Sequence, residues 1–142
     1  MIDEETLRLS RECAEARGIA LSAWLALAAD HHGHWEEGRR NCAEVLAELG
    51  VSPDEESKQE VAEWYARYAP SGPSQRVSTA LDEELLGRVR ENARHAELSV
   101  SAWLALAAWF HTQMDPGLWR YEQRFGKLVR PSRELLSGGF NE

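Results

Sequence analysis

The octapeptide Ser22-Ala23-Trp24-Leu25-Ala26-Leu27-Ala28-Ala29 occurs a second time, unchanged, at residues 101–108. Around it, residues 2–29 and 81–108 align without a gap at an offset of 79 and are identical at 15 of 28 positions. The same register places His32 on His111. The chain is therefore a tandem duplication, with a first copy at residues 2–29 and a second copy at residues 81–108.

Each copy predicts two helices joined by a short break. The first helix begins at a cluster of acids, since negative charge suits the positive end of a helix dipole, and we expect it over about residues 3–16 and about residues 82–95. Gly18 and Glu97 mark the breaks that follow. Ser99 is a good N-cap for the next helix.

The second helix of each copy contains the octapeptide. Alanine and leucine favour helix strongly, and Trp24 and Trp103 supply large apolar area beside small alanines that permit close helix approach. We therefore expect both tryptophans and Leu104 in the core.

Further helices are expected outside the two copies, over about residues 36–49, from a proline turn at 52–56 to about residue 68, and over about residues 118–125. The histidine-rich stretch at 30–34 is expected to end the first octapeptide helix. Proline, glycine and serine at 70–74 predict a linker. The expected domains are a strandless helical repeat with an acidic helical tail at 1–69 and a repeat with a basic, aromatic helical tail at 75–142.

Charge divides the chain into unequal halves. The net charge is −8, and residues 1–70 carry 15 acids against 7 Lys/Arg, whereas residues 71–142 carry 9 of each. An acidic surface repels phosphate, so any nucleic-acid contact is expected in the second half.

There is no secretory pattern, and the longest apolar run, nine residues, is too short to cross a membrane. We expect a cytoplasmic protein without a membrane partner.

One segment, residues 75–81, predicts a β-strand. Residues alternate there with a period of two. One set is Val77, Thr79 and Leu81, and the residues between and before them are Arg76, Ser78 and Ala80. A lone strand must pair to satisfy its backbone hydrogen bonds, and the first copy has nothing before it that could serve as a second strand. We therefore expect pairing with another chain, in a homodimer.

The order of elements in the second copy resembles a known family. The strand is followed by Leu81-Asp82-Glu83-Glu84-Leu85-Leu86, a helix, a tight turn, and Leu98-Ser99-Val100-Ser101-Ala102-Trp103-Leu104 at the start of a second helix. This order is similar to that of the ribbon-helix-helix repressors and antitoxins, the Arc/MetJ/CopG-like group, over about residues 75–110. The resemblance implies a mostly α fold of two tandem ribbon-helix-helix-like units with extra helices and one short strand, 75–81, paired between chains.

The resemblance also implies a function, because in that family the paired strands enter the DNA major groove. By position, Arg76, Ser78 and Ala80 would contact bases, Val77, Thr79 and Leu81 would face inward, and Ser99, Val100 and Ser101 would hold a phosphate at a helix start. It predicts a transcriptional regulator of the repressor or antitoxin type, with double-stranded operator DNA and a toxin or another protein as partners. The alternative is a helical adaptor or structural protein that does not bind DNA but dimerises and binds another protein through its duplicated helices.

A basic stretch in the second half has two interpretations. Its cations lie among aromatic side chains, a mixture that suits stacking on nucleic acid or contact with a partner; they are Arg120, Arg124, Lys127 and Arg130. The other interpretation is an amphipathic helix whose cations clamp the acidic first half of this or a neighbouring chain.

We expect no metal, no cofactor and no catalysis. His31 and His34, or Asp30 and His34, can share a helical face, but a structural zinc site needs four ligands and Cys42 is the sole further candidate nearby. Gly-rich phosphate loops and Gly-x-Ser-x-Gly motifs are absent from the sequence. Cys13 and Cys42 have no pairing pattern and are expected to be small buried hydrophobic residues.

Overall fold

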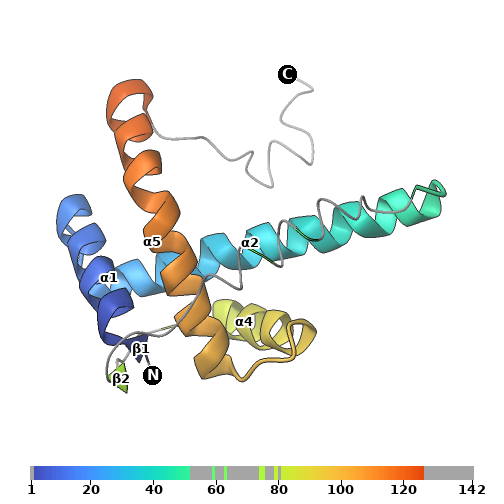
Figure 1. The fold of residues 1–142 in the computed structure, drawn as a ribbon, viewed down its shortest axis with the longest axis horizontal. Helices are drawn as coiled ribbons and strands as arrows, with labels where there is room; N and C mark the ends of the chain where they lie inside the picture. Colours follow the sequence, from blue (N-terminus) through green and yellow to red (C-terminus); the bar gives the residue numbers. More distant parts are fainter. Residues whose placement is uncertain are drawn as a thin grey trace.

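The computed structural model describes residues 2–51, 59, 63, 74, 75, 79 and 81–126. Two short strands lie side by side near the start of α1, and two pairs of helices make up the rest (Figure 1). In chain order the elements are β1 (Ile2–Asp3), α1 (Glu4–Arg17), α2 (Leu21–Glu48), β2 (Ser74–Gln75), α4 (Glu83–His95) and α5 (Val100–Phe125). The expected linker, apart from Ser74, and the expected helix from the turn at 52–56, apart from Gln59 and Glu63, lie outside the described residues.

Local side-chain chemistry sets the helix starts and the breaks. The carboxylate of Asp3 accepts from the Thr6 amide at 3.1 Å, and that of Asp82 accepts from the Leu85 amide at 2.7 Å. Ser99 caps α5 in the same way, with its hydroxyl 3.1 Å from the Ala102 amide. These contacts satisfy amides that have no partner inside the helix. The chain turns between helices through left-handed backbone, at Gly18 with φ 69° and at Glu97 with φ 58°.

The second helices are longer than the sequence predicts. Both run on without a break, α2 through the histidine-rich stretch at 30–34 and α5 through Pro116, so the expected helix end and the separate helices at 36 and 118 are wrong. Gly33 lies inside α2 at a close approach, since a Cβ there would lie 3.2 Å from Nδ2 of Asn92 on α4. The glycine therefore serves helix packing and not helix termination.

The two copies pack across one another. Helix α5 contacts α1 and α2 of the first copy as well as α4 of its own, and α2 contacts both α1 and α4. In Figure 1, α5 crosses α2, with α1 on one side of the crossing and α4 on the other. The far ends of α2 and α5 point away from this crossing in different directions. We call residues 2–37 and 81–116 the body.

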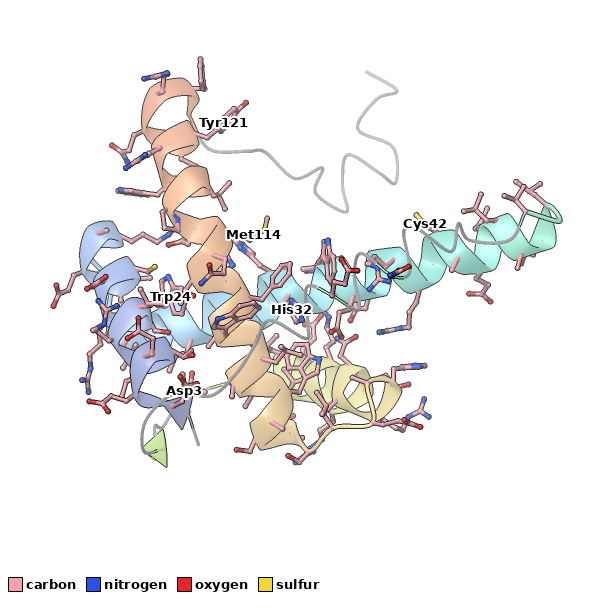
Figure 2. All side chains as sticks on the ribbon, viewed as in Figure 1. Asp3, Trp24, His32, Cys42, Met114 and Tyr121 are labelled. Atoms are coloured by element: carbon pink, nitrogen blue, oxygen red, sulfur yellow. The ribbon has the colours of Figure 1, made fainter. Side chains whose placement is uncertain are left out.

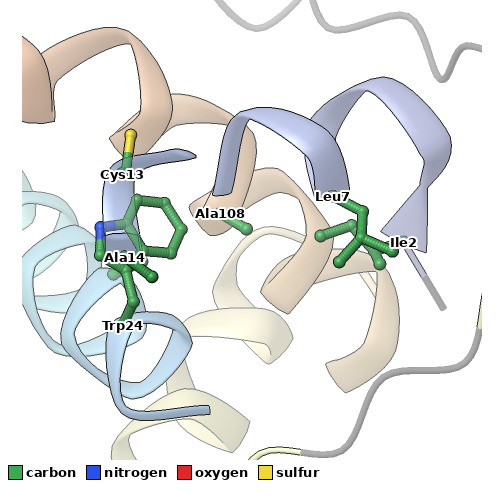
Figure 3. Close-up of a cluster of buried hydrophobic side chains, with 7 residues drawn as sticks. Ile2, Leu7, Cys13, Ala14, Trp24 and Ala108 are labelled. Carbon is green, nitrogen blue, oxygen red and sulfur yellow. The ribbon is translucent and has the colours of Figure 1, made fainter. Parts of the chain in front are cut away.

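The apolar core consists of two equivalent clusters, each centred on one tryptophan. Figure 3 shows the first, Ile2, Leu7, Cys13, Ala14, Trp24 and Ala28 with Ala108 of the second copy. The second contains Val89, Ala93, Trp103 and Ala107 with Ala29 of the first copy. Ala29 and Ala108 are equivalent in the repeat, so each copy contributes the same alanine to the other copy's cluster. The core is shared through a pseudo-twofold relation.

The expected inter-chain ribbon is wrong. Strand β2 covers Ser74–Gln75 alone and pairs antiparallel with β1 of the same chain, Gln75 opposite Ile2 and Ser74 opposite Asp3. The stretch directly before α1 thus supplies the partner that we expected from a second chain. The fold of two tandem ribbon-helix-helix-like units paired between chains through 75–81 is therefore contradicted.

The alternation of apolar and polar residues in 75–81, which predicted a strand, has a different explanation at Thr79 and Leu81. The Thr79 hydroxyl donates to the Ser22 carbonyl at 2.9 Å, and Leu81 packs against the second core cluster. Neither residue belongs to a strand. Over so few residues, a connecting segment whose alternate side chains contact the helices shows the same period of two as a half-buried strand.

Candidate functional site

The centre of the body contains two crossed indole–carboxylate contacts. The Trp24 indole N–H donates to Asp115 Oδ2 at 3.2 Å, and the Trp103 indole N–H donates to Glu36 Oε2 at 3.0 Å. The offset of 79 relates Trp24 to Trp103 and Glu36 to Asp115, so one contact is the repeat-equivalent of the other. Each joins a tryptophan of one copy to an acid that follows the octapeptide of the other.

Histidine rings accompany both contacts with matching geometry. The ring centroids of Trp24 and His111 are 5.4 Å apart, as are those of Trp103 and His32. Each histidine also lies four residues before the acid of its own helix, with His32 Nε2 3.0 Å from Glu36 Oε1 and His111 Nε2 3.5 Å from Asp115 Oδ1. The pseudo-twofold relation therefore includes polar groups as well as the apolar core.

Asp115 is held by a guanidinium. Nε of Arg17 donates to both Asp115 oxygens, at 2.8 and 3.0 Å, and Nη1 of Arg17 donates to Glu122 at 3.2 Å. The Arg17 guanidinium also lies over the Trp119 ring, 5.2 Å from the centroid. Burial by itself raises the pKa of Asp115, but His111, Arg17 and the indole N–H outweigh it and hold that pKa well below its ordinary value.

Glu36 has a different environment, because the repeat-equivalent of Arg17 is Ala96. Among the contacts that the structure describes for Glu36, the guanidinium of Arg40 lies on the same helix, with its Nη1 4.0 Å from the Glu36 carboxylate. Arg40 is itself engaged with Asn92, donating to Oδ1 at 2.6 Å. Asp115 therefore has a close ion pair with an arginine of the other copy, whereas the arginine described beside Glu36 is more distant and belongs to its own helix.

A polar network joins α4 to α2. Arg88 reaches Asp30 at 3.0 Å and Glu37 at 3.1 Å, and the buried Asn92 amide donates to Glu37 at 3.2 Å. The Arg88 guanidinium also contacts His34, at 3.0 Å from Nδ1. These contacts orient α4 on the body, since each satisfies a polar group at the helix interface.

The geometry gives these groups a structural role. Histidine and carboxylate side by side are the parts of a general-base pair, but His32 and His111 are only 2% and 4% exposed, and both acids already accept an indole N–H.

Within the described residues, no group of three or more His, Cys, Asp or Glu side chains is placed to hold a metal ion. Burial raises the pKa of the Cys13 thiol to about 11, so this cysteine stays protonated and unreactive at neutral pH. Cys42 is exposed, contrary to the expectation of burial.

The exposed apolar side chains gather on two helix ends, which we call the acidic arm (residues 41–51, at the end of α2) and the basic arm (residues 118–125, at the end of α5). Of nine large hydrophobic side chains exposed in the described part of the chain, six lie on the arms: Val45, Leu46, Leu49, Val51, Tyr121 and Phe125. Cys42 and Tyr121 mark the two arms in Figure 2. The arms are therefore the surfaces best suited to a partner.

The structure describes only some of the residues expected to contact DNA. Ser99, Val100 and Ser101 begin α5, with Ser99 acting as its cap, and Arg120 and Arg124 are exposed on the basic arm. The strand residues Arg76, Val77, Ser78 and Ala80, together with Lys127 and Arg130, lie outside the described residues. Exposed Glu4 directly follows β1 and places negative charge beside the strand pair, while the neighbouring Glu5 is ion-paired with Arg8.

Sequence reasoning did not identify the buried acids Glu36 and Asp115 or the arginines that contact the body's acids, although the repeat contains a pattern that indicates the two acids. Both copies contain tryptophan, then histidine eight positions later, then an acid four positions after that, as in Trp24, His32 and Glu36. A repeated polar pattern in a buried helix indicates a shared polar centre. Arg17, Arg88 and Asn92 have no equivalent in the other copy, so the repeat carries no signal for them.

No described helix is long and apolar enough to cross a membrane. A scan against protein-family models and searches of curated proteins and of solved structures gave no match to this chain. The resemblance to the ribbon-helix-helix family stays a prediction.

Proposed function

We propose that this chain is a non-enzymatic helical adaptor that binds another protein through the acidic and basic arms. The observation that supports this best is the position of the exposed hydrophobic side chains, with Leu49 71% and Phe125 68% exposed at the helix ends while Trp24 and Trp103 of the body are fully buried. Large side chains exposed together on one element are typical of protein-contact surfaces. A cytosolic location stays a prediction.

Regulation through DNA binding, the other function that the sequence predicts, also stays a prediction. The inter-chain ribbon on which it depended has been replaced by a two-residue pairing within the chain. The exposed carboxylate of Glu4 beside that pairing repels phosphate. The adaptor function requires neither the ribbon nor a basic surface around it.

Site-specific photo-cross-linking in cells tests the adaptor function. A photoreactive residue replaces Leu49 or Phe125 on the arms and, as matched controls on exposed sites of the body, Arg11 or Arg90, which are equivalent in the repeat. We expect a cross-linked protein product of defined mass from the arm positions and none from the body positions. Equal products from arm and body, or none from the arms, would contradict the proposal.

A DNA-retention assay separates the two functions. The purified full chain is mixed with DNA from its own promoter at low and at physiological salt. We expect no sequence-preferring retention. Retention that prefers the promoter and weakens steeply with salt would favour the regulator instead.

A further inference from the structure

The two arms carry the same spacing of charged and apolar residues with opposite charge. On the acidic arm, Glu44 and Glu48 each directly precede an exposed apolar residue, Val45 and Leu49. On the basic arm, Arg120 and Arg124 each directly precede an exposed aromatic residue, Tyr121 and Phe125. Residues four apart lie on the same side of a helix, so each arm presents an apolar stripe flanked by two like charges.

The exposure of these stripes is substantial. Val45 is 53% and Leu49 71% exposed on the acidic arm, and Tyr121 is 44% and Phe125 68% exposed on the basic arm. Glu44, Glu48 and Arg120 form no ion pair with another described residue, and Arg124 lies over the neighbouring Phe125 ring at 6.0 Å from its centroid. An apolar stripe flanked by unpaired charges is the arrangement by which helices of different chains choose their partners.

The arms of one chain do not pair with each other. In Figure 1 the ends of α2 and α5 diverge from the crossing of the two helices. The basic arm is also tied to α1, because Arg17 joins Glu122 and lies over Trp119. Each arm is therefore positioned to meet its complement on a second molecule.

We propose that the chain self-associates by packing the acidic arm of one copy against the basic arm of a second copy. This inference rests on the proposed function and names its partner. Val45 and Leu49 then bury against Tyr121 and Phe125, while the two glutamates face the two arginines. A reciprocal arrangement forms this contact twice and closes a dimer with twofold symmetry.

Charge reversal with mixing tests the proposal on the purified full chain, in reductant because Cys42 is exposed. One variant carries Glu44→Arg and Glu48→Arg, so both of its arms are basic. The other carries Arg120→Glu and Arg124→Glu, so both of its arms are acidic. The control, Arg11→Glu with Arg90→Glu, changes the net charge as the second variant does but on exposed sites of the body.

Light scattering after size exclusion gives the molar mass. We expect twice the 16.1 kDa chain mass for the wild type and the control. Each reversed variant alone should associate at least about tenfold more weakly, since like charges then face one another. An equimolar mixture of the two should regain the dimer, because each basic arm again meets an acidic one.

The outcomes separate this inference from the proposed function. A monomeric wild type, or a dimer that neither reversal weakens, overturns arm-to-arm pairing. So does a mixture that fails to regain the dimer while circular dichroism shows both variants folded. If the wild type is monomeric but the arms still cross-link a different protein in cells, the adaptor function stands and its partner is not a second copy.

Discussion

Trp24 and Trp103 occupy equivalent places in the two copies, yet the acids that accept from their indoles are held differently. Asp115 has an ion pair with Arg17 from the other copy, whereas Glu36 has Arg40 of its own helix at 4.0 Å. The difference follows from one position, arginine at 17 and alanine at 96. Both copies therefore contain the indole–carboxylate contact, with different described cations beside the two buried acids.

The largest expected effect comes from breaking the stronger contact. Asp115→Asn should lower the free energy of unfolding by about 3 kcal/mol, because Arg17, only 11% exposed, loses its bidentate carboxylate and keeps Glu122 at 3.2 Å as its remaining described one. Glu36→Gln should cost about 1–2 kcal/mol, since an amide oxygen still accepts the Trp103 indole N–H. Urea denaturation of both variants measures the difference. Equal losses would show that Arg17 does not distinguish the two contacts.

A second comparison concerns equivalent leucines of the first helices. Leu7 is 2% exposed in the first core cluster, while its repeat-equivalent Leu86 is only half-buried. Leu7→Ala should lower the free energy of unfolding by about 3 kcal/mol and Leu86→Ala by about 1 kcal/mol. The reverse order in chemical denaturation would mean that α4 and not α1 is the better packed helix.

Acid should weaken the body through Asp115. Its pKa is lower in the folded state than the ordinary value of about 3.9, so its stabilisation is present above about pH 4 and is lost as the pH falls toward the folded pKa. We expect a loss on the order of 2 kcal/mol over that range. Thermal unfolding across pH should show a shallower acid decline in Asp115→Asn than in the wild type. Identical declines would contradict this assignment.

The smallest effects on stability are expected on the arms. Leu49→Ser and Phe125→Ser remove exposed side chains, so each should change the free energy of unfolding by less than about 0.5 kcal/mol at concentrations where the chain is monomeric. The same changes should weaken self-association. A large loss of monomer stability would instead show that the arms belong to the core.

Much of the helical layout could be predicted from sequence, because the determining chemistry is local. The acid clusters, Gly18, Glu97 and Ser99 set helix starts and breaks, and these signals act within a few residues of themselves. The octapeptide predicted the two central helices. Its exact repetition also indicated that the two copies share one packing scheme.

The remainder depended on contacts between distant residues. Gly33 and Pro116 are helix-ending residues by propensity, but packing of α2 and α5 against the other copy overrides that preference. The ribbon was expected between chains because a second strand was sought before the first copy, whereas the pairing strand is Ile2–Asp3 at the start of that copy. The sequence showed an acidic first half and a basic stretch within the second half, while the divergence of the two arms required the structure.

Hydrogen exchange of the indole N–H groups tests most directly whether the two copies form one cooperative body. Heteronuclear NMR reports the Trp24 and Trp103 indoles separately. The crossed contacts predict that both exchange through global unfolding, with free energies within about 1 kcal/mol of each other and of the value from denaturation. Rapid exchange at one indole while the other stays protected would show that the copies unfold separately and would contradict a shared body.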